Sequence, residues 1–192
     1  SNAPATTVCF GGGGRFAFFA GANGLSVWDA QSRTVSNRMR GSGTRRTKVF
    51  VSADGSCVLV DSGLKTLDVR DNLGQKVLLR IDDPPYRWTQ PNWPESNWPE
   101  SFSLSPDGRF ALSWRQDQAI ALLSLETGRV VRSFDSGFAA CFTADGQYAL
   151  LCQKGSSIDI VEIASGHVVR RFGTATTETL CAGVDGRLAL TT

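Results

Sequence analysis

An Asp-Gly turn joins two apolar segments in the sequence Ser103-Leu104-Ser105-Pro106-Asp107-Gly108-Arg109-Phe110-Ala111-Leu112. The same turn recurs as Ala53-Asp54-Gly55, Ala144-Asp145-Gly146 and Val184-Asp185-Gly186, and Gly13-Gly14 occupies its place in a first copy. The last glycines of the five turns lie at positions 14, 55, 108, 146 and 186, at intervals of 41, 53, 38 and 40 residues. Self-similarity at a nearly fixed period indicates a chain of internal repeats, with an insertion in one interval.

Each turn lies between two short apolar segments of the kind that form β-strands. Its glycine can adopt a positive φ, which allows the two strands to pair as a hairpin. The first strand of each repeat is expected at Val8-Cys9-Phe10, Val49-Phe50-Val51, Phe102-Ser103-Leu104, Ala140-Cys141-Phe142 and Leu180-Cys181-Ala182. The fourth is expected at Val35 to Met39, Val77 to Ile81, Val130 to Phe134 and Val168 to Phe172. The sequence therefore predicts an all-β chain of four-stranded antiparallel meanders, with a period close to that of β-propeller blades.

Two stretches carry a resemblance to a known family. Ser103 to Arg109 and Ser26-Val27-Trp28-Asp29 resemble WD40-like β-propeller repeats, and the resemblance extends from Val8 to Leu190. The Gly-His dipeptide of that family is absent and the Trp-Asp pair occurs once, so the repeats resemble a degenerate, bacterial type. The resemblance implies a WD repeat scaffold without catalytic activity, which binds proteins or peptides on one face or at the channel.

The repeats divide the chain into four complete blades and a half-blade. Ser1 to Ala3 is expected to be an expression scar, and residues 4–192 form one WD40-like propeller. The blades are expected at about 8–40, 48–82, 102–135 and 139–173, with the half-blade at 179–192 and an inserted loop at 82–101. We expect the ring to be completed by another chain or by a longer parent protein. Open strand edges invite pairing, so self-association through the open propeller edges is also expected.

Composition excludes several function classes. The chain is 41% hydrophobic and 20% charged, with a formal net charge of +2, which is typical of a soluble globular protein and too small for nucleic-acid binding by overall charge. Five cysteines without a Cys-x-x-Cys spacing and a single His favour neither a zinc site nor a disulfide framework. We therefore expect no metal, no cofactor, no membrane partner and a reducing, cytoplasmic location.

The inserted loop 82–101 is the first candidate binding site. It contains a tandem repeat of Asn-Trp-Pro-Glu-Ser at 92–101, and its candidate contact residues are Tyr86, Arg87, Trp88, Trp93 and Trp98. A long Pro-rich aromatic loop between a fourth strand and the next first strand is suited to contact a protein or peptide partner. Packing of the Trp rings onto the neighbouring blades is an equally weighted alternative.

A basic segment precedes the second blade. Residues 38–48 contain five cations and no carboxylate, and Arg45, Arg46 and Lys48 are its candidate binding residues. This connection is of the same type as the inserted loop, so both are expected on one propeller face, where Arg side chains could bind carboxylate or phosphate groups. The alternatives are a solvated loop, and pairing with the carboxylates of the inserted loop.

Other conspicuous residues have structural explanations. The turn aspartates are expected to accept turn hydrogen bonds, and Gly11 to Gly14 open a strand rather than a phosphate-binding helix. Cys9, Cys141 and Cys181 share one inner-strand position and are expected to be packing residues, and His167 is expected to lie at the surface. No catalytic residue is predicted. The leading hypothesis is an interaction scaffold; the alternatives are part of a propeller enzyme whose catalytic residues lie outside this chain, and an anion or nucleic-acid surface.

Overall fold

The computed structural model describes residues 5–21, 24–40, 47–61, 66–82, 101–114, 118–153, 157–173, 179–182 and 188–191. This part of the chain contains strands and turns and no helix, which confirms the predicted all-β class. The strands are β1 (Ala5–Gly11), β2 (Phe16–Gly21), β3 (Gly24–Asp29), β4 (Thr34–Arg40), β5 (Lys48–Val51), β6 (Val58–Asp61), β7 (Thr66–Arg70), β8 (Val77–Asp82), β9 (Ser101–Leu104), β10 (Phe110–Trp114), β11 (Gln118–Ser124), β12 (Val130–Phe142), β13 (Tyr148–Gln153), β14 (Ser157–Glu162), β15 (Val168–Phe172), β16 (Thr179–Ala182) and β17 (Leu188–Thr191).

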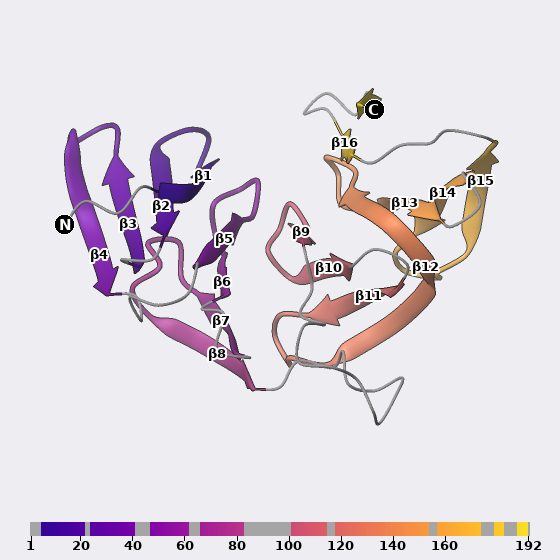
Figure 1. Cartoon of the computed structure of the whole chain (residues 1–192), viewed down its shortest axis with the longest axis horizontal. Coiled ribbons are helices and arrows are strands. Elements are labelled where there is room, and N and C mark those ends of the chain that lie inside the picture. Colours follow the sequence, from indigo (N-terminus) through magenta and orange to yellow (C-terminus); the bar gives the residue numbers. More distant parts are fainter. Residues whose placement is uncertain are drawn as a thin grey trace.

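The strands form antiparallel meanders arranged as the blades of an open propeller. The sheet orders are β1-β2-β3-β4, β5-β6-β7-β8, β9 to β15 in one sheet, and β16-β17. Figure 1 shows these units around an arc, with β1, β5, β9 and β16 toward its centre and β4, β8 and β15 at its periphery. The central strands pack on one another in turn along the arc. The predicted four and a half blades of antiparallel strands are confirmed.

One strand differs from the sequence prediction. Two separate strands were expected at 130–134 and 140–142, whereas β12 is continuous and serves both as the fourth strand of the third blade and as the first strand of the fourth. Gly137 lies at the crossover and is the register partner of both Gln118 and Gln153. A Cβ at this position would lie 2.4 Å from the Cys152 carbonyl oxygen and 2.7 Å from Ile120 Cδ1. A glycine thus lets β12 pass from one blade to the next without a break.

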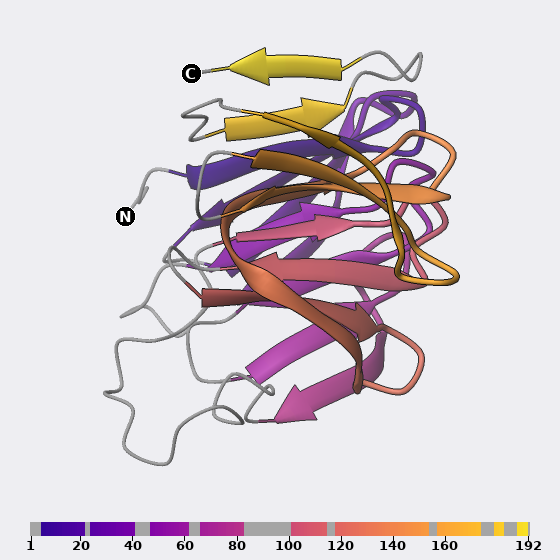
Figure 2. The same cartoon turned by 90° about the vertical axis from the view of Figure 1, so that its right-hand side faces the viewer.

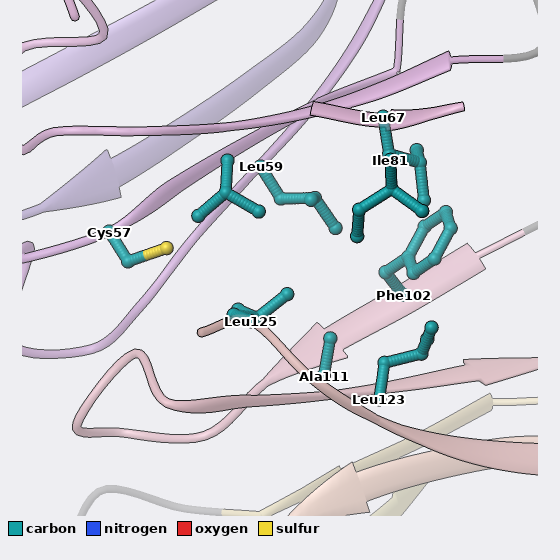
Figure 3. Packing of buried hydrophobic residues seen from close by; sticks show 9 residues of the cluster. Cys57, Leu59, Leu67, Ile81, Phe102, Ala111, Leu123 and Leu125 are labelled. Carbon is teal, nitrogen blue, oxygen red and sulfur yellow. The ribbon is translucent and has the colours of Figure 1, made fainter. Parts of the chain in front are cut away.

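The core consists of the interfaces between neighbouring blades. Figure 3 shows the interface of the second and third blades, where Leu59, Leu67 and Ile81 face Phe102, Ala111 and Leu123. Both faces of the inner blades are therefore apolar, because each face is buried against a neighbour. Equivalent clusters join the first blade to the second and the third to the fourth.

The Asp-Gly turns share one hydrogen-bonding pattern. Asp107 Oδ1 accepts bonds from the Ser105 hydroxyl at 2.6 Å and from the backbone N–H of Arg109 at 3.1 Å, while Ser105 Oγ accepts a bond from the Phe110 N–H at 2.9 Å. The second and fourth blades repeat this pattern around Asp54 and Asp145. The turn glycines have φ between +60° and +90°. The predicted structural role of these two aspartates and of Asp107 is confirmed, and Asp185 lies outside the described residues.

The turns also interlock between blades. The Asp54 N–H donates to the Pro106 carbonyl of the next blade at 3.2 Å. A Cβ on Gly108 would lie 2.6 Å from Cys57 Cβ, and a Cβ on Gly55 would lie 2.2 Å from the Gly12 backbone nitrogen. Glycine is therefore required at these turns for two reasons: it adopts a positive φ, and it allows adjacent blades to approach closely.

Candidate functional site

One of the predicted binding residues, Lys48, lies in the described part of the chain. It opens β5, its side chain is partly buried, and its register partner is Asp61 on β6, which is buried. The other predicted binding residues lie outside the described residues: Tyr86, Arg87, Trp88, Trp93, Trp98, Arg45 and Arg46.

The strands that flank the two segments identify the face of the propeller from which they leave. The basic segment connects the end of β4 at Arg40 to the start of β5 at Lys48, and the inserted loop connects the end of β8 at Asp82 to the start of β9 at Ser101. In an antiparallel meander, the start of the first strand and the end of the fourth lie on the same side. Figure 2 shows the strands side-on, with the start of β1 and the end of β8 on one side and the described hairpin turns on the other. The described ends of the two connections therefore lie on one face of the propeller.

Buried carboxylates in the blades are engaged by arginines. Asp68 on β7 accepts a hydrogen bond from Arg70 at 2.6 Å and two from Arg80 on β8, at 2.8 and 3.2 Å. Burial by itself would raise the pKa of Asp68, but the hydrogen bonds from Arg80 and Arg70 outweigh it and hold the pKa below its ordinary value. This group is a structural anion at neutral pH and is not suited to act as a general acid.

The fourth blade repeats this arrangement. Asp159 on β14 is fully buried and accepts two bonds from Arg171 on β15, at 2.6 and 2.8 Å. Asp159 and Arg171 are cross-strand partners, as Asp68 and Arg80 are in the second blade. The hydrogen bond to Asp159 raises the pKa of Arg171. Each pair ties a third strand to its fourth strand, and sequence reasoning missed both because their members lie 12 residues apart in the chain.

The first blade contains an ion pair near a hairpin turn. Arg15 donates to Asp29 at 3.1 Å, and the hydrogen bond from Arg15 is the main reason why the pKa of Asp29 lies below its ordinary value. The Gln31 N–H also donates to Asp29, at 2.8 Å. This aspartate belongs to the one Trp-Asp pair of the sequence, so its role in the described structure is to fasten β2 and β3 at the turn end of the blade.

The cysteines of the described strands are packing residues. Cys9 donates a hydrogen bond to the Val49 carbonyl at 3.2 Å, and burial raises its pKa to about 11. Burial likewise raises the pKa of Cys57 to about 11, and Cys141 is buried. A raised pKa suppresses the thiolate that reacts with electrophiles. The side chain of Cys181 lies outside the described residues.

The only histidine of the sequence lies at the surface. His167 is exposed in the turn between β14 and β15, as predicted. No group of three or more potential metal ligands is present among the described residues. The described segments also contain no helix with the length and hydropathy of a membrane span.

Comparisons with known proteins identify the fold. No protein-family model matches the sequence, and the search of curated proteins finds no match. Among solved structures, the chain is similar to the crystal structure of the Myceliophteria thermophila Cps50 (Swd1) β-propeller domain, with a TM-score of 0.75 and 15% sequence identity. The superposition covers 99% of this chain and 62% of that domain. The chain thus has a β-propeller fold and spans about three fifths of the length of this structural neighbour.

Proposed function

We propose that this chain is part of a non-enzymatic interaction scaffold, in which one propeller face presents the inserted loop and the basic segment to a protein or peptide partner. The observation that supports the proposal is that the described strands flanking two segments of unusual composition begin and end on the same face of adjacent blades. The described blade interiors differ from these segments, because Asp29, Asp68 and Asp159 are paired with arginines and the described cysteines are packed in the core. The β-propeller fold supports the proposal, since propellers with a WD40-type architecture commonly serve as interaction scaffolds.

The two segments supply complementary chemistry for such a partner. Trp93 and Trp98 offer large apolar surfaces of the type that anchors interfaces, and Arg45 and Arg46 offer paired donors for carboxylates. The partner that fits this combination is a peptide segment with apolar side chains next to acidic residues. Lys48, the first residue of β5, adds a cation at the start of this strand on the same face.

Peptide selection followed by substitution tests the proposal. Peptides selected from a displayed random library by the wild-type chain are titrated against Trp93→Ala/Trp98→Ala and Arg45→Ala/Arg46→Ala. Each double variant should bind at least about 10-fold more weakly, because interface anchors carry most of the binding energy. Arg129→Ala is the matched control, because Arg129 is exposed in the turn between β11 and β12 on the opposite face.

Thermal unfolding separates binding from packing. The Trp double variant should keep the melting temperature of the wild type. A loss of several degrees would show that the rings pack onto the blades and would contradict the proposal. Selection of oligonucleotides instead of peptides, with affinity falling steeply as salt rises, would favour the anion-surface alternative.

A further inference from the structure

The outer face of the first blade is apolar and exposed in the structure. Phe10 and Val8 on β1 are 67% and 52% exposed, and Phe19 on β2 is 38% exposed. Val8 and Phe19 are cross-strand partners, and Phe10 lies two residues from Val8 on the same face of the sheet. The three side chains therefore form one continuous patch over the two innermost strands of the first blade. Contiguous patches of large apolar side chains on a soluble protein indicate a contact surface.

The other blades show what normally covers these positions. Six residues separate the two members of one cross-strand pair between the first and second strands of each blade, which makes these pairs equivalent: Phe10↔Ala17, Val51↔Val58, Leu104↔Ala111 and Phe142↔Ala149. Counted from these pairs, Phe10 is equivalent to Phe142, which is 6% exposed, and to Val51 and Leu104, which are partly buried against the preceding blade.

The other two patch residues have buried equivalents in the same way. Val8 is equivalent to Val49 and Phe102, which are 1% and 6% exposed. Phe19 is equivalent to Val60 and Leu151, which are 2% and 0% exposed. The patch therefore occupies the positions of a blade interface that is complete at every other junction described.

In the described junctions, these positions pack against the preceding blade, on the face of that blade that is directed toward its successor. In the second junction, Phe102 packs against Leu59 and Leu67 of the preceding blade. In the first, Val49 packs against Phe18 and Leu25 of the preceding blade. The surface complementary to Val8, Phe10 and Phe19 is thus the far face of a preceding blade, the face that looks away from its own predecessor.

The β16-β17 hairpin supplies a face of this kind. Among the described residues, β16 packs on β12, and neither β16 nor β17 packs extensively on β1. Its central pairs are Leu180↔Leu190, Cys181↔Ala189 and Ala182↔Leu188, so the sequence pattern assigns apolar residues to both faces of the hairpin. The hairpin has two strands, and the exposed patch on the first blade also spans two strands. Figure 1 shows β1 and β16 on opposite sides of the opening in the arc.

We propose that the patch formed by Val8, Phe10 and Phe19 binds the β16-β17 hairpin of a second copy of this chain, in the packing that joins consecutive blades within the chain. Both copies carry both surfaces, so the contact closes into a two-fold dimer where the geometry permits and otherwise extends head to tail. This contact uses the sheet surface of the first blade, whereas the proposed function uses the propeller face from which the inserted loop and the basic segment leave. Either proposal can therefore fail without the other.

Sedimentation equilibrium across low to high micromolar concentrations tests the proposal. The wild-type chain of 20.7 kDa should show reversible, concentration-dependent association. Phe10→Asp and Phe19→Asp should each raise the dissociation constant at least about 30-fold, because a charge then lies at the centre of an apolar contact. Both positions are exposed in the single chain, so these variants should keep the wild-type unfolding midpoint.

Two further variants make the test specific. Val131→Asp is the matched control, because Val131 is a 54% exposed apolar residue on β12, away from the patch, and it should leave association unchanged. Leu188→Arg and Ala189→Arg place a charge on opposite faces of the hairpin by strand alternation, so one of the two should weaken association as much as Phe10→Asp. A monomer at every concentration, or association that Phe10→Asp leaves intact, would overturn the proposal. Association that depends on Phe10 but on neither Leu188 nor Ala189 would overturn the hairpin as its occupant and indicate contact between two first blades.

Discussion

Gly55→Ala is the substitution that best tests how the blades approach one another. Gly55 has a φ of +73°, and a Cβ there would lie 2.2 Å from the backbone nitrogen and 2.6 Å from the Cα of Gly12 in the preceding blade. Gly13→Ala is a matched control, because Gly13 has a φ of +65° and a Cβ there would meet no atom within 4 Å. The two variants share the conformational strain and differ in the collision with the neighbouring blade.

The magnitudes follow from these two terms. A non-glycine residue in the left-handed region costs about 1–2 kcal/mol, which applies to both variants. Overpacking against a backbone that cannot rotate away adds about 1–3 kcal/mol for Gly55→Ala alone. The gain from restricting the unfolded chain is the same for both and cancels in the comparison. We expect Gly55→Ala to lose about 2 kcal/mol more free energy of unfolding than Gly13→Ala.

Urea unfolding followed by circular dichroism measures this difference. With a denaturant slope of about 2 kcal/mol/M for a chain of this size, the midpoint of Gly55→Ala should lie about 1 M below that of Gly13→Ala. Equal midpoints for the two variants would refute the close approach of the turns.

Three other predictions concern buried polar groups. The lowered pKa of Asp68 contributes stability above the ordinary aspartate pKa of 3.8, and this contribution is lost as the pH falls below that value. Asp68→Asn should therefore lower the urea midpoint at pH 7 and reduce its change between pH 7 and pH 3; an unchanged pH dependence would contradict this. Arg171→Leu should destabilise the chain more than Asp159→Leu, because the first change leaves a fully buried carboxylate unpaired, whereas the second leaves an arginine whose side chain is 60% exposed to water. The opposite order of urea midpoints would contradict the burial of Asp159. Finally, a pKa of about 11 in place of 9.0 should slow labelling of Cys9 and Cys57 by a bulky disulfide reagent about 100-fold at pH 8 relative to the unfolded chain. Rapid labelling of the native protein would show that these thiols are not buried.

The repeat architecture could be predicted from the sequence because its determinants are local. An Asp-Gly turn such as Asp107-Gly108 needs a positive φ and a carboxylate acceptor within a few residues, and both requirements can be read from neighbouring letters. The apolar segments on either side mark the strands in the same way. The all-β class, the repeating blade unit and the structural role of the described turn aspartates could therefore be predicted without any knowledge of the folded form.

For the candidate site, the sequence predicted which face of the propeller the strands flanking the two segments share. Antiparallel meanders place Lys48 and the ends of the inserted loop on one face, because strand direction alternates. Which residues there contact one another depends on side-chain packing between blades, and sequence spacing does not contain this information. The sequence predicted self-association through open propeller edges, but the residues of the exposed patch are defined by burial and by the register of Phe19 with Val8.

Tertiary structure alone decided the remaining features, since each depends on atoms far apart in the chain. The Asp159 and Arg171 pair forms because register places the two residues opposite each other on β14 and β15. The continuous β12 depends on the room that Gly137 leaves between Ile120 and Cys152. A glycine is needed at position 55 because its turn approaches the Gly12 backbone of the preceding blade more closely than a Cβ allows. Local sequence thus determined the repeating unit, and the packing of one unit on the next determined how the units join.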